Sequence, residues 1–490
     1  MDARSYIEAN ASGFFGALKE WLAIPSISAD PARRDDVRRS AEWLAAHLRK
    51  TGFPITEIWE TGSASDGGTG SGESAGTGRP AVFAEWPADD PAAPVVLVYG
   101  HHDVQPVEPL EEWRSPPFEP AERDGRLLGR GASDDKGQVL FHALGVRANL
   151  AASGRGAPPV TIKLLIEGEE ESGSPHFAGL LRRERARLDC DVIVVSDTTM
   201  WSEEVPSMCT GMRGLLDAQI DLTGPARDLH SGSFGGAVPN PLHALAALLA
   251  GLHDDAGRVT LPRFYDKVLP LSDEERELFA RLPFAENAWL ADAGDSRVAS
   301  GEEGYTTLER IWARPTAEIN GIWGGHTGPG TKTIIPREAH AKLSFRLVAD
   351  QEPADIAAAL REYVADRTPP GIEATVTFGG PGVRPSASPV GSPVVRAARS
   401  AMARAFGREI LFTREGGSGP EADLADILGA PLVFVAVGLD SDRIHAPNEK
   451  VEMGLLLKGA EAAAYLWDEL ASAAGELAPG KLALGAEPRP

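Results

Sequence analysis

The segment VVLVYGHHDVQP, which runs from Val95 to Pro106, contains an apolar run that breaks at Gly100. Such a run, bounded by a glycine, predicts a short buried strand. Two histidines, His101 and His102, and the carboxylate of Asp103 follow at once. The strand would therefore end on groups that bind metals, although histidines beside acidic residues are also common in polar turns. The remaining sequence has to distinguish a metal site from a turn.

Helix-like and strand-like segments alternate on both sides of this strand. In the first part of the chain the pattern predicts helices over 5–22, 35–51, 138–152 and 176–187, and strands over 81–86, 95–99, 160–166 and 192–195. In the last part it predicts helices over 394–406 and 454–470, and strands over 410–413 and 431–437. This alternation predicts an α/β fold with a mostly parallel sheet covered on both faces.

The pattern differs in the middle of the chain. Segments 213–222, 240–253, 316–320, 341–348, 353–366 and 372–378 give the order β-α-β-β-α-β. That order is typical of a ferredoxin-like, four-stranded antiparallel sheet with two helices on one face. We therefore expect one α/β domain, residues 1–207 and 386–490, interrupted by an inserted α+β domain, residues 208–385. Residues 254–315 form a long insertion of undefined structure, and the Gly/Ser-rich segment 62–78 predicts a surface loop.

Charge and cysteine content exclude several classes of function. The chain of 490 residues has 48 Lys+Arg and 71 Asp+Glu, a formal net charge of −23, so a nucleic-acid partner is not expected. No apolar run approaches the roughly 18 residues of a membrane span. The two cysteines, Cys190 and Cys209, form no C-x-x-C pair, which excludes a thiolate zinc site and predicts a reduced, cytoplasmic setting.

Four further segments carry ligand-type side chains next to a predicted strand or helix. They are GRGASDDKG (129–137), VTIKLLIEGEEESGS (160–174), VIVVSDTTMW (192–201) and VFVAVGLDSDRIHAPNEK (433–450). The first offers Asp134 or Asp135, the second four glutamates, the third Asp197 and the fourth His445. Each segment alone is as well explained by an acidic turn or a solvated loop.

Taken together, these segments favour a metal site, because ligands in an open α/β sheet gather at the carboxyl ends of the strands. Two imidazoles and three carboxylates are about what two neighbouring divalent ions with one bridging carboxylate require. Zinc accepts such a mixed set of nitrogen and oxygen ligands, and so does manganese. The crowded glutamates after 166 would repel one another unless a cation neutralised them.

The motifs GHHDVQP, GRGASDDKG, EEESGS, VSDTTMW and RIHAPNEK resemble, in this order, those of the dinuclear-zinc exopeptidase family. That family includes acetylornithine deacetylase, succinyl-diaminopimelate desuccinylase, carboxypeptidase G and the aminoacylases. The sequence looks most like the branch of carnosinase and cytosolic nonspecific dipeptidase. The resemblance covers nearly the whole chain, except for the Gly/Ser-rich segment. It implies a catalytic α/β domain and an inserted lid and dimerisation domain.

The resemblance implies a role for each ligand. His101 and Asp197 would hold one metal, Glu171 and His445 the other, and Asp134 would bridge the two. His102 occupies a position where the family has a small or apolar residue, so either neighbouring imidazole could be the ligand.

Two further acidic residues have implied roles in the reaction. Asp103 would orient the ligating imidazole through its far ring nitrogen. Glu170 would be the general base. It would take a proton from the water shared by the two metals, so that a hydroxide forms, and would return that proton to the leaving amine. Glu169 is a near neighbour of this base in the sequence.

The inserted domain and the loop after it carry motifs that resemble those of the family's lid and substrate site. ARDLHSGSFGG (226–236) implies that His230 reaches the active site of a partner subunit, and hence a homodimer. GPGTKTIIP (328–336) places Thr333 near the substrate. LSFRLV (343–348) and REGGSGP (414–420) imply that Arg346, Gly417 and Ser418 bind the C-terminal carboxylate.

The resemblance implies a metal-dependent dipeptidase that cleaves the bond next to a free C-terminal carboxylate. An alternative within the hydrolases is an N-acyl or N-carbamoyl amino-acid amidohydrolase that uses the same metals. An inactive relative acting as a binding protein is a third hypothesis. It would be expected to lack a ligand or the base, whereas Asp134, Glu170, Glu171, Asp197 and His445 are all present.

Overall fold

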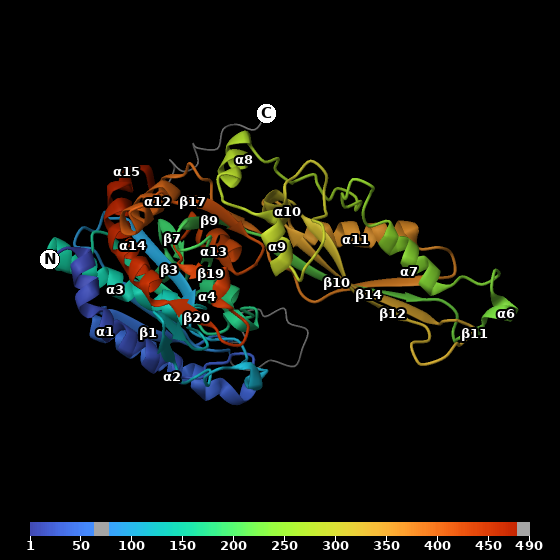
Figure 1. The fold of residues 1–490 in the computed structure, drawn as a ribbon, viewed down its shortest axis with the longest axis horizontal. Helices are drawn as coiled ribbons and strands as arrows, with labels where there is room; N and C mark the ends of the chain where they lie inside the picture. Colours follow the sequence, from blue (N-terminus) through green and yellow to red (C-terminus); the bar gives the residue numbers. More distant parts are fainter. Residues whose placement is uncertain (63–77, 478–490) are drawn as a thin grey trace. The chain divides into compact units, whose positions relative to one another are not determined.

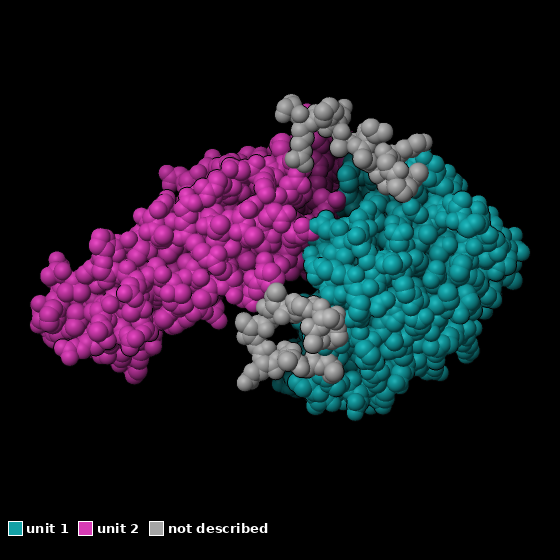
Figure 2. Space-filling model, turned by 180° about the vertical axis from the view of Figure 1, so that it is seen from behind, with its two compact units in different colours: residues 1–210, 388–413, 420–490 teal, residues 211–387, 414–419 magenta. Residues whose placement is uncertain are grey.

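The computed structural model describes residues 1–62 and 78–477, and its chain forms two compact units (Figure 2). Unit 1 contains Met1–Thr210, Ser388–Thr413 and the chain from Pro420 onward. Unit 2 contains Gly211–Ala387 and also Arg414–Gly419, a segment that follows the inserted part in sequence. Of the Gly/Ser-rich segment 62–78, residues 63–77 lie outside the described residues.

Unit 1 is built on a six-stranded sheet (Figure 1). In spatial order its strands are β1 (Ile55–Trp59), β2 (Ala81–Trp86), β6 (Thr161–Glu167), β3 (Val95–His101), β7 (Val192–Val195) and β18 (Leu432–Phe434). The last four run parallel, whereas β1, β2 and β6 pair antiparallel. Apart from those of the edge strand β1, the apolar residues of the sheet are almost all buried, as continuous apolar runs predict for strands covered on both faces. The predicted mostly parallel sheet is confirmed.

The helices of unit 1 form two groups. In the first, α1 (Ala3–Leu22), α3 (Lys136–Ser153), α14 (Met453–Ser472) and α12 (Pro393–Phe406) pack in succession, and α2 (Arg34–Thr51) packs on β1 and β2. The second contains α4 (Phe177–Arg183), α5 (Arg185–Leu188) and α13 (Glu421–Leu428), which contacts β7. The single helix predicted over 176–187 is therefore two short helices, because the α-helical conformation is lost at Glu184. The short α15 (Ala474–Leu477) follows α14.

Short strands join the loops of unit 1. One sheet has the order β20 (Lys450–Glu452), β5 (Arg126–Leu128) and β4 (Ala121–Arg123). Another pairs β8 (Thr199–Met200) with β19 (Gly438–Leu439). The sheet β16 (Ser386–Ala387), β9 (Ser207–Met212) and β17 (Leu411–Glu415) contains the segments where the chain passes from one unit to the other. The β20–β5 pairing brings residue 450 next to residue 128, so the segment after His445 lies beside the segment before Asp134.

Unit 2 has the predicted β-α-β-β-α-β order. Its elements are β10 (Gly214–Thr223), α7 (Pro241–Ala250), β12 (Thr316–Gly324), β14 (Glu338–Leu347), α11 (Pro353–Arg367) and β15 (Glu373–Phe378). The strands form an antiparallel sheet in the order β12-β14-β10-β15. Alternate residues of β10, among them Leu216 and Ile220, are buried with Leu248 of α7 and Leu360 of α11 in one core. The ferredoxin-like architecture is confirmed.

The remaining segments of unit 2 are short. The insertion over 254–315 contains α8 (Asp273–Ala280), α9 (Glu286–Asp292) and α10 (Thr307–Ala313). The short strand β11 (Leu229–His230) pairs antiparallel with β13 (Ile334–Ile335), and α6 (Ser231–Phe234) follows β11. Among the described residues of the whole chain, no helix has the length and apolar character needed to cross a membrane.

Candidate metal centre

Three neighbouring parallel strands deliver side chains to one edge of the unit 1 sheet. His101 is the last residue of β3, the 3₁₀ turn Glu170–Ser172 follows β6, and Asp197 follows β7. Because β6, β3 and β7 are adjacent and parallel, their carboxyl ends meet at the same place. Two loops from elsewhere in the unit add Asp134, just before α3, and His445. The topology thus explains why residues far apart in sequence come together.

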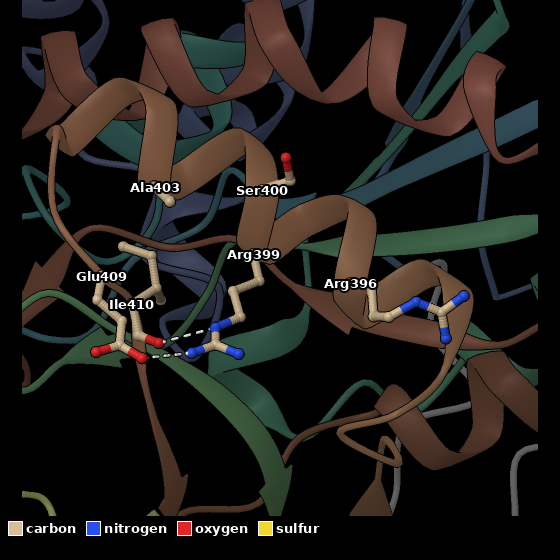
Figure 3. Close-up of a pocket in the computed structure, with 6 residues that line it drawn as sticks. All are labelled: Arg396, Arg399, Ser400, Ala403, Glu409 and Ile410. Atoms are coloured by element: carbon tan, nitrogen blue, oxygen red, sulfur yellow. Dashed lines mark hydrogen bonds and ion pairs between the residues drawn. The ribbon is translucent and has the colours of Figure 1, made fainter.

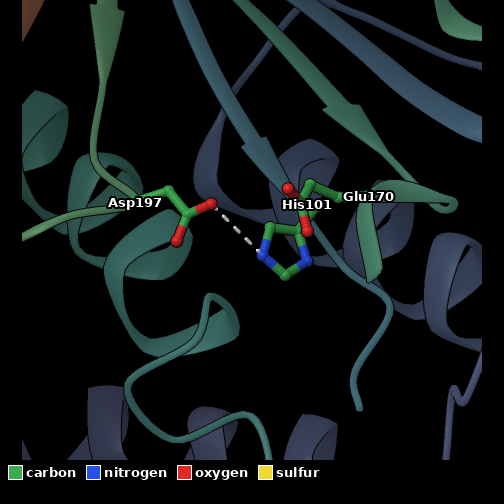
Figure 4. A group of neighbouring side chains, drawn as sticks. All are labelled: His101, Glu170 and Asp197. Atoms are coloured by element: carbon green, nitrogen blue, oxygen red, sulfur yellow. Dashed lines mark ion pairs between the residues drawn. The ribbon is translucent and has the colours of Figure 1, made fainter. Parts of the chain in front are cut away.

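His101 is at the centre of this cluster and is fully buried. Its Nε2 lies 2.9 Å from Asp134 Oδ1 and 3.5 Å from Asp197 Oδ2. Figure 4 shows Asp197 and Glu170 beside the same imidazole, and ligand atoms of these three residues lie within 4.8 Å of one another. On the other side of the ring, Nδ1 lies 3.4 Å from Asp103 Oδ1 and 3.1 Å from the Asp103 carbonyl oxygen. The ring is therefore held from behind, with Nε2 directed at the carboxylates.

Asp134 faces two imidazoles at once. Its Oδ1 is the atom 2.9 Å from His101 Nε2, and its Oδ2 lies 2.9 Å from His445 Nε2. His445 Nε2 is also 3.3 Å from Glu171 Oε2. The two oxygens of one carboxylate thus belong to two neighbouring groups of ligands, one around His101 and one around His445.

The donor set fits divalent cations. The side chains of the cluster offer only imidazole nitrogen or carboxylate oxygen. Besides the group of His101, Glu170 and Asp197, ligand atoms of His101, Asp134 and Glu171 form a second group within 4.8 Å. Glu171 Oε1 is buried and has no hydrogen-bond partner, although a buried carboxylate oxygen normally has one. An oxygen left free inside such a cluster is suited to a cation.

The electrostatics of the cluster reflect this crowding. Burial raises the pKa of Asp134, but the hydrogen bonds from His101 and His445 outweigh it and lower the pKa. Hydrogen bonds to Asp134 and Glu171 raise the pKa of His445 to about 10. Burial raises the pKa of Glu171 to about 7 and that of Glu170 well above its ordinary value. The Asp134 anion is thus stabilised by the neighbouring imidazoles, whereas burial destabilises the Glu170 and Glu171 anions, which positive charge from protons or metal ions would compensate.

The structure distinguishes the cluster residues from their neighbours in sequence. His102 turns away: its Nε2 donates to the Pro80 carbonyl oxygen at 2.9 Å, and burial lowers its pKa to about 4. Glu169 accepts hydrogen bonds from the Arg79 amide at 2.8 Å and from His176 Nδ1 at 2.9 Å. These two residues have structural partners outside the ligand cluster.

Two further carboxylates support the cluster through backbone amides. Asp135 accepts from the backbone N–H of His101 at 3.2 Å, so it is Asp134 that joins the ligands. Asp103 accepts from the backbone N–H of Glu171 through Oδ2 at 3.0 Å. Asp103 therefore contacts one ligand by its side chain and fixes the backbone of another.

The predicted lid and substrate residues form two groups within unit 2. His230 is exposed, its Nδ1 accepts from the Gly232 amide at 3.1 Å, and it pairs with Ile334 across β11 and β13. Thr333 is adjacent to it, because the Thr333 carbonyl oxygen accepts from the Ser231 amide at 3.0 Å. The structure thus brings His230 and Thr333 together.

The second group lies at the start of the unit 2 sheet. Arg346 Nη1 donates to Ser418 Oγ at 3.0 Å, and that hydroxyl donates to the Arg213 carbonyl oxygen at 2.6 Å. Gly417, beside this serine, is exposed. The loop Arg414–Gly419 is therefore attached to β14 at the residues predicted to bind a carboxylate.

Sequence reasoning missed one residue beside Arg346 and two residues beside the cluster around His101 and Asp134. Arg213 directly precedes β10, its carbonyl oxygen accepts from Ser418, and its guanidinium lies near that of Arg346. Burial and this neighbouring arginine lower the pKa of Arg213 to about 10. Gln105, within the segment quoted first, donates to Glu171 Oε2 at 2.6 Å. The third, Glu449, follows His445 in the last motif and accepts a hydrogen bond from the Asp134 amide. The contacts of all three depend on the tertiary fold, so no local pattern could have indicated them.

Unit 1 also has a hollow beside α12, which is lined by Arg396, Arg399, Ser400, Ala403, Glu409 and Ile410 (Figure 3). Arg399 donates to Glu409 at 2.9 Å and to the Ile410 carbonyl oxygen at 3.1 Å. Arg396 pairs with Glu476 at 2.5 Å. Both guanidinium groups thus have carboxylate partners within the chain, and we assign no ligand to this hollow.

Comparisons with known proteins agree with the fold. A family model described as peptidase family M20/M25/M40 matches residues 97–469. The chain is 30% identical over 480 residues to the Beta-Ala-His dipeptidase of Rattus norvegicus, covering 95% of this chain and 94% of the relative. It is 29% identical to the Cys-Gly metallodipeptidase DUG1 of Candida albicans, covering 91% and 92% of the two chains.

Solved structures show the same relationship. The dipeptidase Dug1p of Saccharomyces cerevisiae superposes with a TM-score of 0.76 at 27% identity, over 96% of this chain and 98% of that one. Human carnosine dipeptidase 1 superposes with a TM-score of 0.72 at 30% identity, over the same shares of the two chains. These relatives belong to the branch that the sequence motifs predicted. The chain therefore belongs to peptidase family M20/M25/M40 and is a hydrolase that acts on peptide bonds.

Proposed function

We propose that this chain hydrolyses dipeptides that have a free C-terminal carboxylate, using two divalent cations. It is a metal-dependent dipeptidase, as relatives in its branch of the family are named. His101 and Asp197 would hold one cation, Glu171 and His445 the other, and Asp134 would bridge them. The observation that carries this proposal is that the two oxygens of Asp134 each lie 2.9 Å from a different imidazole.

Zinc is the cation that we propose, with manganese as the second choice. The ligand set combines imidazole nitrogens and carboxylate oxygens without a thiolate, which both ions accept. Thiolate ligands are not available in the cluster, because neither Cys190 nor Cys209 belongs to it. We also propose the reducing, cytoplasmic setting that two cysteines without a C-x-x-C pair predict.

Glu170 is the proposed general base. When bound, the cations supply Lewis acidity that polarises the carbonyl of the scissile bond and lowers the pKa of water. Glu170 takes the proton from the attacking water and returns it to the nitrogen of the leaving amine. Burial raises the pKa of its carboxyl well above the ordinary value, so its carboxylate is a stronger base than an exposed one. Asp103 keeps His101 and Glu171 in place during these steps.

Residues of unit 2 would hold the C-terminal carboxylate of the substrate and contact the carbonyl of its scissile bond. We assign Arg346, Ser418 and Gly417 to the C-terminal carboxylate, because a guanidinium and a hydroxyl already lie 3.0 Å apart there. His230 would contact the carbonyl that is attacked and stabilise its developing negative charge, and Thr333 would lie near the substrate. His230 is exposed at the end of the short strand β11, which supports a role in the site of a partner subunit.

A homodimer would explain the free edge of the unit 2 sheet. Strand β12 is the outermost strand in the order β12-β14-β10-β15. It exposes Ile319 at 40%, Ile322 at 59% and Trp323 at 40%. A long edge strand with exposed apolar side chains is normally covered, because its unpaired backbone groups invite another strand. A second copy of the chain is the occupant that we propose.

Replacement of Glu170 by Gln tests the proposed function. The variant keeps the size of the side chain but cannot accept a proton, so we expect kcat to fall by about 10²–10⁴-fold. Metal analysis of the same sample should still give two equivalents. Glu169→Gln is the matched control, since Glu169 contacts Arg79 and His176 instead of the cluster, and it should retain most activity. Full activity in Glu170→Gln would contradict the assignment of the base.

A further inference from the structure

Glu449 is a fully buried carboxylate that contacts the loop of Asp134. Its Oε1 accepts from the backbone amides of Ser133 at 3.0 Å and of Asp134 at 3.2 Å. Its Oε2 accepts from the Gly131 amide at 2.9 Å and from Arg130 Nη1 at 2.8 Å. One side chain thus binds three backbone N–H groups and one guanidinium of a single loop.

The backbone of Glu449 is attached to the same loop. Its carbonyl oxygen accepts from the Gly129 amide at 3.0 Å, and the next residue, Lys450, pairs with Leu128 where β20 meets β5. Glu449 also follows His445 by four residues, so one segment carries a ligand and the carboxylate that contacts the loop of another ligand. The loops of Asp134 and His445 are therefore joined to each other through Glu449.

Burying the charge of Glu449 costs free energy, and its hydrogen-bond and ion-pair partners compensate that cost. A buried carboxylate is tolerated only when charges and hydrogen bonds compensate its desolvation. Arg130 supplies the charge: it is 2% exposed, lies over the ring of Trp113 and donates to the Pro106 carbonyl oxygen at 3.0 Å. The amides of Gly131, Ser133 and Asp134 would be left without an acceptor if an apolar side chain replaced Glu449.

We propose that Glu449 is a positioning residue that fixes the backbone of Asp134, so that each carboxylate oxygen of Asp134 reaches a different metal. This inference rests on the proposed function, in which Asp134 is the bridging ligand. The hydrogen bond to the Asp134 amide holds the ligand itself, and those to Gly131 and Ser133 hold the residues just before it. Groups behind a metal ligand commonly change metal affinity by about 10–100-fold when they are replaced.

Glu449→Gln is the variant that tests this role. It is isosteric, but one of its two terminal atoms becomes an NH₂ group, so either the Ser133 and Asp134 amides or the Arg130 and Gly131 donors lose their acceptor. We expect zinc affinity, measured by competition with a chromophoric chelator, to fall at least about tenfold. We also expect kcat to fall with little change in KM, since Glu449 is fully buried and acts through the loop of Asp134.

Asp442→Asn is the matched control. Asp442 is equally buried, lies on the same segment and accepts from Ser133 Oγ at 2.8 Å, from the Leu439 amide at 2.9 Å and from Lys450. It accepts no hydrogen bond from the Asp134 amide. We therefore expect Asp442→Asn to lower the thermal stability of the metal-free protein while zinc affinity stays near that of the wild type.

The outcomes separate this inference from the proposed function. Wild-type protein that binds no zinc or cleaves no dipeptide would contradict the proposed function. Wild-type protein that does both, beside a Glu449→Gln variant with unchanged zinc affinity, would overturn only the role of Glu449. Equal losses of zinc affinity in Glu449→Gln and Asp442→Asn, in proportion to their losses of stability, would also overturn it, since they would indicate a merely structural role. Glu449→Asp, a shorter carboxylate, should bind zinc more weakly than the wild type if position matters.

Discussion

At the scale of residues, the site is organised by carboxylates that contact imidazoles. Asp134 contacts His101 and His445 at 2.9 Å each, and Glu171 lies 3.3 Å from the same His445 nitrogen. These hydrogen bonds raise the pKa of His445 to about 10, and burial raises that of Glu171 to about 7. Near pH 7 the His445 imidazole and part of the Glu171 carboxyl groups therefore carry protons, and a metal ion would have to displace these protons to bind there.

We expect metal binding to release protons. A ligand must be deprotonated, so the cation competes with the protons on His445 and Glu171, and raising the pH removes this competition. Zinc affinity should rise from pH 6 to pH 9, by about tenfold per pH unit for each proton displaced. Calorimetry at pH 7 in two buffers with different heats of ionisation measures the proton release. Identical heats in both buffers, with an affinity that does not change with pH, would be inconsistent with this account.

Site residues at strand ends could be predicted from the sequence, whereas contacts between distant segments could not. Positions at strand ends, such as His101 and Asp197, follow from local sequence because the carboxyl ends of neighbouring parallel strands share one edge. The selection of His101 over His102 could not be made locally, since adjacent residues point in opposite directions. The contacts of Glu449 could not be predicted either, because its partners lie more than 300 positions earlier in the chain.

At the scale of elements, unit 1 depends on close approach between α3 and α14. Gly145 of α3 faces α14, and a Cβ at this position would lie 2.7 Å from Ala463 Cβ and 2.8 Å from the Ala460 carbonyl oxygen. Asp134 and Asp135 directly precede α3, so the packing of this helix fixes the start of a ligand loop. Helix contacts remote from the metals therefore affect the site through the backbone.

Gly145→Ala should destabilise the protein. The added methyl group has no room, and overpacking of this kind typically costs about 1–3 kcal/mol of unfolding free energy. Gly13→Ala is the matched control: it lies within α1, its Cβ would meet no atom within 4 Å, and it should gain about 0.5–1 kcal/mol from helix propensity. Urea unfolding of the metal-free proteins measures both effects. Equal stabilities for wild type and Gly145→Ala would show that the helices can separate without cost.

Most long elements could be predicted from periodicity, and the missed ones are short or weakly patterned. Strand β2 was predicted at its observed bounds, since a continuous buried run gives a strong signal. Strand β1 was missed because four of its five residues are only partly buried and its sequence alternates poorly. Helix α13 was missed because it has eight residues and follows a Gly/Pro-rich turn. The helices of the insertion over 254–315 are equally short.

At the scale of the whole molecule, the proposal requires a second copy of the chain. Unit 2 presents an exposed His230 and a free edge strand with apolar side chains at Ile319, Ile322 and Trp323. In a symmetric dimer each copy would supply its histidine to the other. By its resemblance, the motif at 226–236 predicts this arrangement.

Mixing two inactive variants tests whether His230 acts across subunits. His230→Ala and Glu170→Gln should each be nearly inactive alone. After subunit exchange at equal concentration, half of the dimers are mixed and each has one complete site, so about one quarter of wild-type activity should return. Mixtures that also carry Ile322→Lys at the exposed edge should recover nothing if β12 forms the interface. No recovery without Ile322→Lys would indicate that His230 acts within its own chain.

The most direct test of the account is a turnover measurement by liquid chromatography and mass spectrometry on the zinc-loaded protein. The panel would contain free-amine dipeptides, their C-terminal amides, N-acetyl and N-carbamoyl amino acids and one tripeptide, with Glu170→Gln as the blank. We predict cleavage of the free-amine dipeptides that have a free carboxylate, and no cleavage by the blank. Cleavage of the N-acetyl or N-carbamoyl compounds alone would contradict the dipeptidase assignment and make the chain an amidohydrolase that uses the same metal centre.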